Sequence, residues 1–283
     1  GEEVAARVLP RAPETDVAWR YLDEFAISCR SGTRLGRRDF RGYQDPLLLH
    51  AYERVLAALR EHPELAMQFN VRYALTGPHF LHGWDRHYLP PPAELLAMPG
   101  AIDRGEGVIE LGPPLARVMP LAYFVPGPAI ERVVLREDAL ARTIELAPAP
   151  IAILEDVREV APIAPVAPGT LPLAAEVLEY ESDSLALLIE APVAGALVVE
   201  EAWYPGWRAF LVDRSGRTDE VPILRANGLV RAIEVPAGRH RVELRFEPPD
   251  GAPLRWLLLG SWIVVLALLI PWPARRGRDR REP

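Results

Sequence analysis

The sequence contains no lysine and only a single cysteine, Cys29. One cysteine cannot form a disulfide within the chain, nor can it supply the several thiolates of a cysteine-based zinc site. All 32 basic residues are therefore arginine, a bias that we attribute to genome composition rather than to function. Glycine is not scarce, but proline is abundant: thirty prolines are about twice the average share, which favours short helices and many irregular connections.

Negative charge predominates in the body of the chain, and the last ten residues reverse it. The whole chain carries a net charge of −7, whereas residues 274–283 hold five arginines against Asp279 and Glu282 and sum to +3. The remaining residues therefore sum to −10. Such a body repels the phosphates of nucleic acids rather than releasing their counterions, so we expect no nucleic-acid partner.

A long apolar run lies near the C-terminus. Residues 256–270 read WLLLGSWIVVLALLI, and the uncharged stretch of nineteen residues to Ala274 corresponds to about 28 Å of helix. Trp256 and Trp272 stand at its two ends, where membrane proteins carry aromatic belts, and the arginine-rich tail follows directly. We expect a transmembrane helix over 254–273, an extracytoplasmic body and a cytoplasmic tail over 274–283. The alternative is a helix buried in the core of a soluble protein.

The N-terminal half has the pattern of a mixed α+β region, which we place over residues 1–146. Apolar residues from Leu48 to Leu59 recur on one helical face behind the helix-start signal Asp45-Pro46, and a second helix is predicted over Ala18–Ser28, followed by a basic linker. Further predicted elements are strands at 67–76, 107–111 and 117–125, and a short helix at 137–144. Residues 147–172 are rich in proline and are interpreted as an extended linker around one candidate strand at 151–154.

The pattern changes to that of strands between Leu173 and Pro248. Val242, Leu244 and Phe246 alternate with charged residues, and turn signals recur at intervals typical of an all-β sandwich. Asn227-Gly228 is the strongest hairpin signal, because both turn positions need a positive φ. We expect an antiparallel β-sandwich of about seven strands over 173–250, which makes the whole chain α+β.

Several short motifs within residues 201–248 carry a resemblance to a known family. They are Tyr204-Pro205-Gly206-Trp207, Ala226-Asn227, Arg231, Pro236-Ala237-Gly238 with His240, and Phe246-Glu247-Pro248. This order resembles the end of the YfhO-type bacterial membrane proteins, which are grouped with the GT-C glycosyltransferases. The sequence departs from that pattern at Trp203, at a longer turn over 213–216 and at Val230. Residues 41–46 and 69–75 resemble the family more loosely.

The resemblance implies that the chain is the C-terminal part of a larger polytopic protein in the bacterial cytoplasmic membrane. The parent would transfer a sugar from a polyprenyl-phosphate donor to a cell-envelope glycan acceptor. The partners would be the lipid bilayer, this donor and acceptor, and the preceding membrane spans. In GT-C enzymes the catalytic acid lies in the first extracytoplasmic loop, so no catalytic residue and no cofactor is expected here. The alternative is a non-enzymatic, single-pass envelope module that binds glycans or proteins.

Two groups of side chains have binding chemistry. Trp203, Tyr204 and Trp207 offer aromatic faces for glycan contact, the alternative being burial in the sandwich core. Arg225 and Arg231 flank the predicted hairpin and suit a phosphate or an acidic lipid head group. The alternative for these arginines is pairing with acidic neighbours, such as Asp219, Glu220 or Glu234.

Two other groups of residues have the side chains of a metal site or of a catalytic carboxyl pair, but their spacing disfavours both functions. Residues 79–87, HFLHGWDRH, contain metal-ligating residue types, but the spacing fits no helical ligand pair and we expect no metal. Glu200 and Glu201 look like a catalytic carboxyl pair. Because neighbours on a strand point to opposite faces, we expect them not to share one substrate.

Overall fold

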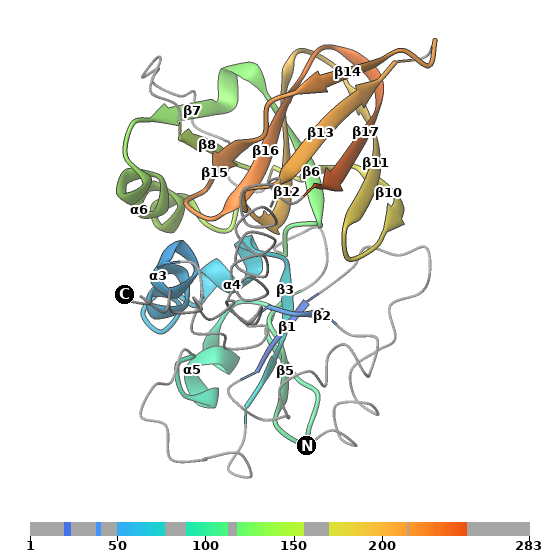
Figure 1. Cartoon of the computed structure of the whole chain (residues 1–283). Coiled ribbons are helices and arrows are strands. Elements are labelled where there is room, and N and C mark those ends of the chain that lie inside the picture. Colours follow the sequence, from blue (N-terminus) through green and yellow to red (C-terminus); the bar gives the residue numbers. More distant parts are fainter. Residues whose placement is uncertain are drawn as a thin grey trace, which may run out of the picture. The chain divides into compact units, whose positions relative to one another are not determined.

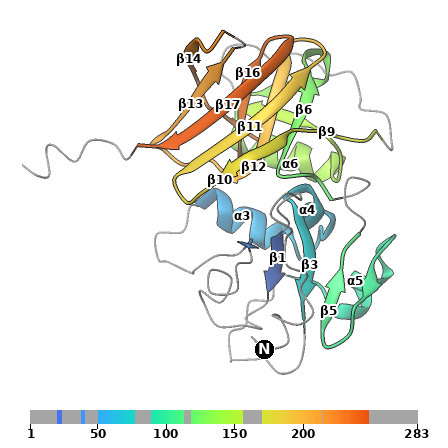
Figure 2. The ribbon, with the colours of Figure 1, turned by 90° about the vertical axis from the view of Figure 1, so that its right-hand side faces the viewer.

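Three β-sheets make up most of the structure (Figures 1 and 2). The computed structural model describes residues 20–23, 38–40, 50–76, 89–112, 118–155, 170–213 and 215–247. The described residues up to Phe246 belong to one compact unit. The prediction of a β-sandwich in the C-terminal part is confirmed, and the described residues are mostly β with a few short helices.

The N-terminal sheet has the strand order β2-β1-β3-β5-β4. Strand β1 pairs in parallel with β2 and β3, whereas β5 pairs antiparallel with β3 and β4. The strands are β1 (Arg20–Asp23), β2 (Arg38–Asp39), β3 (Val71–Leu75), β4 (Ile102–Asp103) and β5 (Val108–Glu110). The helices of this region are α3 (His50–Ala58), α4 (Glu64–Gln68) and α5 (Pro92–Ala97).

The two sheets of the sandwich are visible one behind the other in Figure 2. The five-stranded sheet is antiparallel and consists, in order, of β10 (Glu176–Tyr180), β11 (Ser184–Ala191), β17 (Gly238–Phe246), β13 (Trp207–Val212) and β14 (Thr218–Val221). The seven-stranded sheet consists, in order, of β7 (Ile130–Val133), β8 (Ala152–Glu155), β15 (Leu224–Ala226), β16 (Val230–Val235), β12 (Gly195–Ala202), β6 (Ala122–Pro126) and β9 (Leu173–Ala174). A 3-10 turn, η2 (Gly127–Ala129), joins β6 to β7, and helix α6 (Arg136–Leu146) connects the parallel pair β7 and β8.

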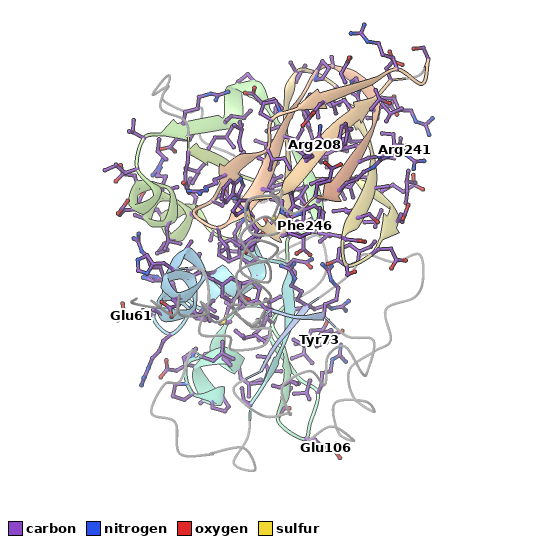
Figure 3. The ribbon with its side chains drawn as sticks, viewed as in Figure 1. Glu61, Tyr73, Glu106, Arg208, Arg241 and Phe246 are labelled. Carbon is purple, nitrogen blue, oxygen red and sulfur yellow. The ribbon has the colours of Figure 1, made fainter. Side chains whose placement is uncertain are left out.

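The seven-stranded sheet is covered on both faces. Leu197 and Ile233 pack against Leu187 and Val242 of the five-stranded sheet. On the other face, Val198 belongs to the core cluster that contains residues of α3, α4 and β3. Double burial explains why β12 reads as an almost continuous apolar run, whereas β17, with one exposed face, alternates between apolar and charged residues. Arg208 and Arg241 lie on this exposed face of the five-stranded sheet (Figure 3). Tyr73, also labelled there, lies in the N-terminal sheet.

The sandwich is larger than the sequence predicted. Its two sheets hold twelve strands among the described residues, rather than about seven. Strands β6 and β7 fall in the range assigned to the mixed N-terminal region, where β6 overlaps the strand predicted over 117–125. Strand β8 confirms the candidate strand predicted over 151–154, but it belongs to the sandwich rather than to a linker. Strand β8 shows no alternation because Ile153 packs towards α6 while its neighbour Leu154 faces the main core. The sequence pattern of a half-buried strand is therefore absent where both faces are covered.

Three local predictions near the N-terminus need correction. Arg20–Asp23 is a strand, where a helix over 18–28 was predicted, because Leu22 is buried and pairs with Ala74 of β3. Strand β2 lies inside the predicted basic linker. The strand predicted over 67–76 begins only at Val71, since α4 extends to Gln68 and Asn70 reverses the chain with a φ of 64°. Pairing with distant strands decides these segments, and that information is not local.

The Asn227-Gly228 turn is confirmed, and it is one residue longer than predicted. Ala226 pairs with Val230, and the turn residues Asn227 and Gly228 have φ values of 52° and 74°. The side chain of Asn227 also contacts a strand that is distant in the sequence, because its Oδ1 accepts a hydrogen bond of 3.0 Å from the amide of Ile153 in β8. The turn thus fixes β8 to the hairpin.

Gly228→Ala is expected to lower the free energy of unfolding by about 1–2 kcal/mol more than Gly216→Ala. Both glycines have a φ near +80°, so both substitutions carry the same backbone cost. A Cβ at Gly228 would stand 2.9 Å from Cβ of Leu140 in α6, whereas a Cβ at Gly216 has no atom within 4 Å. Chemical denaturation of the two variants measures the difference, and equal losses would show that the turn does not pack tightly on α6.

The predicted transmembrane helix over 254–273 and the tail over 274–283 lie outside the described residues. Among the described helices, none is long and apolar enough to cross a membrane. The membrane assignment therefore stays a prediction.

Candidate functional site

Strand β12 departs from the regular ladder at Glu200 and Glu201. Val199 pairs with Arg231 and Ala202 with Val230, so two residues of β12 have no partner on β16. The amide of Glu200 instead donates to the carbonyl of Leu121 at 2.7 Å. A bulge of this kind interrupts the alternation of faces, so the expectation that the two carboxyl groups are held on opposite faces does not apply here. The charge of Arg20 in fact acts on both carboxyl groups.

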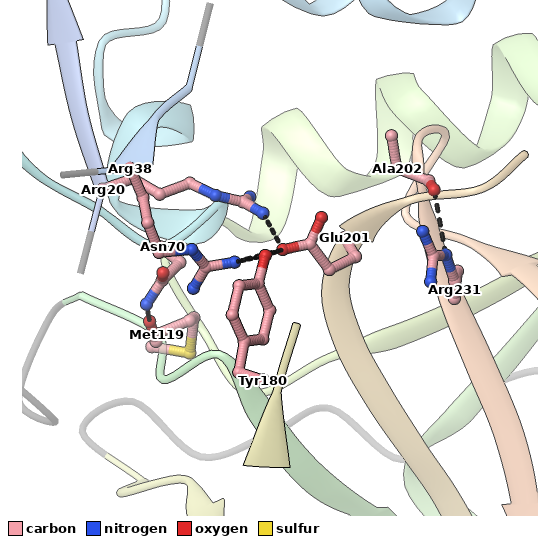
Figure 4. Close-up of polar contacts among 8 residues, drawn as sticks. All are labelled: Arg20, Arg38, Asn70, Met119, Tyr180, Glu201, Ala202 and Arg231. Carbon is pink, nitrogen blue, oxygen red and sulfur yellow. Dashed lines mark hydrogen bonds and ion pairs between the residues drawn. The ribbon is translucent and has the colours of Figure 1, made fainter. Parts of the chain in front are cut away.

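Glu201 is the centre of an ion cluster that joins the sandwich to the N-terminal sheet (Figure 4). Its Oε1 accepts hydrogen bonds from Nη2 of Arg20 at 2.6 Å, from the hydroxyl of Tyr180 at 2.7 Å and from Nη2 of Arg38. The guanidinium of Arg38 also lies over the ring of Tyr180, 4.0 Å from the centroid. Arg20 and Arg38 come from β1 and β2, whereas Tyr180 ends β10. One carboxylate thus receives donors from three strands.

The two adjacent glutamates have opposite protonation behaviour. Burial by itself raises the pKa of Glu201, but the charges of Arg20 and Arg38 outweigh it and bring the pKa down to about 2. Burial raises the pKa of Glu200 to about 8, and Arg20 offsets this only in part. Glu200 is fully buried, and its interaction with the hydroxyl of Tyr123, like the charge of Arg20, offsets the rise in its pKa only in part. At neutral pH, Glu200 is therefore mostly protonated, whereas Glu201 is ionised.

A fully buried tyrosine, Tyr123 of β6, organises the polar groups on the inner side of Glu200. Its hydroxyl donates to the carbonyl of Ile151 at 3.0 Å and accepts from Nε2 of Gln68 at 3.0 Å and from Nδ2 of Asn227 at 3.3 Å. Burial raises the pKa of Tyr123 well above its usual range. Because this hydroxyl is saturated with partners, we assign the group a structural role.

The structure brings four of the five sequence-predicted site residues together in pairs. The guanidinium of Arg225 lies 3.7 Å from the ring centroid of Trp203, and that of Arg231 lies 3.9 Å from the ring centroid of Trp207. Arg225 and Arg231 are direct partners in the β15–β16 register, so their side chains start from the same face of the hairpin. Each cation therefore lies over its own indole ring, an arrangement that offsets the repulsion between two like charges on one face.

Tyr204 is the exposed member of the aromatic group. It is 48% exposed, whereas Trp203 and Trp207 are half-buried. The rings of Tyr204 and Trp207 both lie near the ring of Phe246, with centroid distances of 6.1 and 5.6 Å, and Phe246 ends strand β17 (Figure 3). Trp207 packs against the sandwich core, and Tyr204 is the most exposed of the three aromatic side chains.

The two arginines differ in their charge partners. Nη1 of Arg225 lies 3.8 Å from Oε2 of Glu155. Arg231 is buried, and its Nε donates to the carbonyl of Ala202 at 3.0 Å (Figure 4). The acids proposed from sequence as their partners are bound elsewhere, because Asp219, Glu220 and Glu234 pair with Arg217, Arg208 and Arg132, respectively.

The predicted histidine segment at 79–87 lies outside the described residues. Within the part of the chain that the structure describes, no group of three or more His, Cys, Asp or Glu side chains could hold a metal ion.

Comparisons with known proteins leave the family open. No family model matches the chain, and no curated protein matches it. A solved structure that matches is that of the arabinofuranosyltransferase AftD from mycobacteria. The two are 26% identical over 39% of this chain and 9% of that chain, with a TM-score of 0.25. A TM-score this low does not establish a common fold, so no property of that enzyme is transferred to this chain.

Sequence reasoning missed the cluster of Arg20, Arg38, Tyr180 and Glu201. These residues lie far apart in the chain, and no spacing rule connects them. The available signal was the pair of acidic residues at the end of the buried run in β12, which reads GALVVEEA. Two consecutive acids in such a strand need either partners or a bulge, and the structure contains both.

Proposed function

We propose that the chain is the extracytoplasmic accessory region, with the last membrane span, of a GT-C-type membrane glycosyltransferase. The observation that carries the proposal is where the motifs that resemble the YfhO-type proteins lie in the fold. Residues 204–207 connect β12 to β13, Asn227-Gly228 connects β15 to β16, and residues 236–238 connect β16 to β17. Strand β17 then ends at Phe246, ten residues before the apolar run that begins at Trp256.

The chemistry of the region suits binding rather than catalysis. Tyr204 offers an exposed aromatic face for a sugar ring beside the Arg231–Trp207 pair. Glu200, the carboxyl group with a pKa suited to a general acid, is fully buried and out of reach of a substrate. The catalytic acid then belongs to the first extracytoplasmic loop of the parent protein, and this region holds the acceptor or the donor beside it.

The localisation and partners follow from the same proposal. The body would lie outside the bacterial cytoplasmic membrane, with the C-terminus in the cytoplasm. It would meet the lipid bilayer, a polyprenyl-phosphate-linked sugar and a cell-envelope glycan acceptor.

The test is sugar transfer by membranes that contain the product of the complete coding region, measured with a labelled polyprenyl-phosphate sugar and isolated envelope glycan. We expect transfer by the wild type, and for Tyr204→Ala an acceptor KM about threefold to tenfold higher with little change in kcat, the size of one lost stacking contact. Phe210→Ala is the matched control, because Phe210 lies between Arg208 and Arg245 on the exposed face of the five-stranded sheet. It should leave KM unchanged.

Two results would contradict the proposal. One is a coding region that lacks further membrane spans upstream of Gly1, which would favour a single-pass envelope module. The other is recovery of the chain in the aqueous phase of a detergent phase separation, which would show that residues 256–270 are not membrane-spanning.

A further inference from the structure

Arg231 is a buried cation without a paired anion. It is 5% exposed, the carbonyl of Ala202 accepts from its Nε, and its Nη1 has no hydrogen-bond partner. Trp207 covers one face of the guanidinium. A buried guanidinium that leaves a donor unsatisfied is costly to fold, so such a group needs an explanation.

The acidic groups near Arg231 do not provide its counter-ion. Glu201 is close enough for its charge to act on Arg231, but it makes no ion pair with Arg231 within 4 Å, and its Oε1 already accepts from Arg20, Arg38 and Tyr180. Glu200 is mostly protonated at neutral pH, since burial raises its pKa to about 8. Burial likewise lowers the pKa of Arg231, to about 10, which leaves it charged at neutral pH.

Arg225, the partner of Arg231 in the hairpin, has the contacts expected of an arginine with a structural role. It starts from the paired position on β15 and stacks on Trp203 in the same way. It is nevertheless one-third exposed, and Glu155 lies within ion-pair distance. Arg231 therefore differs from Arg225 in one feature that needs an explanation, which is its buried Nη1 without a hydrogen-bond partner.

We propose that Arg231 is the anchor of a binding site for the phosphate group of a phosphate monoester or diester. A guanidinium presents its donors in a planar fork that matches phosphate oxygens, and Trp207 holds that fork in one orientation. The anion would bind at the edge of the guanidinium where Nη1 lies. The identity of the ligand rests on the proposed function, since a polyprenyl phosphate carries such a group. The test of the site does not depend on transfer activity.

The test is isothermal titration calorimetry of the full chain in detergent with three probes: inorganic phosphate, a polyprenyl monophosphate and the uncharged polyprenol. Arg231→Gln is compared with Arg225→Gln. We expect saturable binding of a phosphate-bearing probe by the wild type, at least tenfold weaker binding by Arg231→Gln, and a change of less than twofold in Arg225→Gln. Binding of inorganic phosphate as tightly as the polyprenyl phosphate would identify free phosphate as the ligand, and a strong preference for the lipid would identify the lipid-linked group.

Thermal unfolding without ligand separates this site from a structural arginine. Arg231→Gln should keep or raise the melting temperature, because it removes a buried charge that forms no ion pair. Arg231→Lys keeps the positive charge but not the planar fork of donors, so it should bind the phosphate-bearing probe with intermediate affinity. It serves as a control in case Arg231→Gln fails to fold. The proposal is overturned if the wild type binds no phosphate-bearing probe, if polyprenol binds as tightly as its phosphate, or if Arg231→Gln binds like the wild type.

Discussion

Glu201→Gln is expected to lower the free energy of unfolding by about 2–4 kcal/mol at pH 7. The substitution leaves two largely buried guanidinium groups, those of Arg20 and Arg38, without the carboxylate on which both converge. An amide oxygen can accept the same hydrogen bonds, but it carries no charge, so the desolvation of the arginines is no longer compensated. Because these arginines belong to the N-terminal sheet and Glu201 to the sandwich, the loss should also weaken the contact between the two regions.

Chemical denaturation followed by circular dichroism measures this effect, with Glu220→Gln as the matched control. Glu220 pairs with Arg208 through two hydrogen bonds, but both side chains are more than 40% exposed. Exposed ion pairs contribute about 1 kcal/mol or less, so the control should lose little stability. Equal losses in the two variants would mean that the Glu201 cluster is energetically an ordinary surface ion pair.

The stability of the protein is expected to fall between pH 4.5 and pH 8 because of Glu200. Its pKa rises from 4.5 in the unfolded chain to about 8 in the folded protein. In this window the folded state holds a proton that the unfolded state has released, so raising the pH favours unfolding. The total loss attributable to Glu200 is roughly 3–5 kcal/mol, and it is complete above about pH 8.

Glu201 acts in the opposite direction and in a different window. Its folded pKa of about 2 lies below the unfolded value of 4.5, so its contribution is present above pH 4.5 and disappears as the pH falls towards 2. Between pH 5 and pH 9 the two glutamates can therefore be separated.

The measurement is the free energy of unfolding at pH 5, 6, 7, 8 and 9 for the wild type and for Glu200→Gln. The glutamine cannot ionise, so its curve should be flatter than that of the wild type, and the difference between the two should grow up to about pH 8. Curves that run parallel across the whole range would show that Glu200 is ionised in the folded protein, and that the buried carboxyl group has a partner of opposite charge.

Local patterns in the sequence were sufficient for the outer part of the sandwich. Strand β17 alternates between buried and exposed residues along its length, and Asn227-Gly228 adopts the positive φ values that its residue types favour. Helix α6 was predicted within two residues of its bounds. These elements depend on one solvent-facing side or on backbone conformations that few residue types tolerate, and both leave a signal within a few residues.

The tertiary structure alone decided the inner part of the fold and the composition of the candidate site. Strand β1 carries no alternation that marks it, because distant strands and helices cover it, and β8 was predicted as a strand but not as part of the sandwich. The bulge in β12 directs Glu201 to two arginines that lie more than 160 residues away in the chain. The sequence by itself determined that Arg225 and Arg231 flank a hairpin. Which of them has an acidic partner depended on a carboxylate from β8 reaching Arg225 and not Arg231, a consequence of strand order that no local pattern contains.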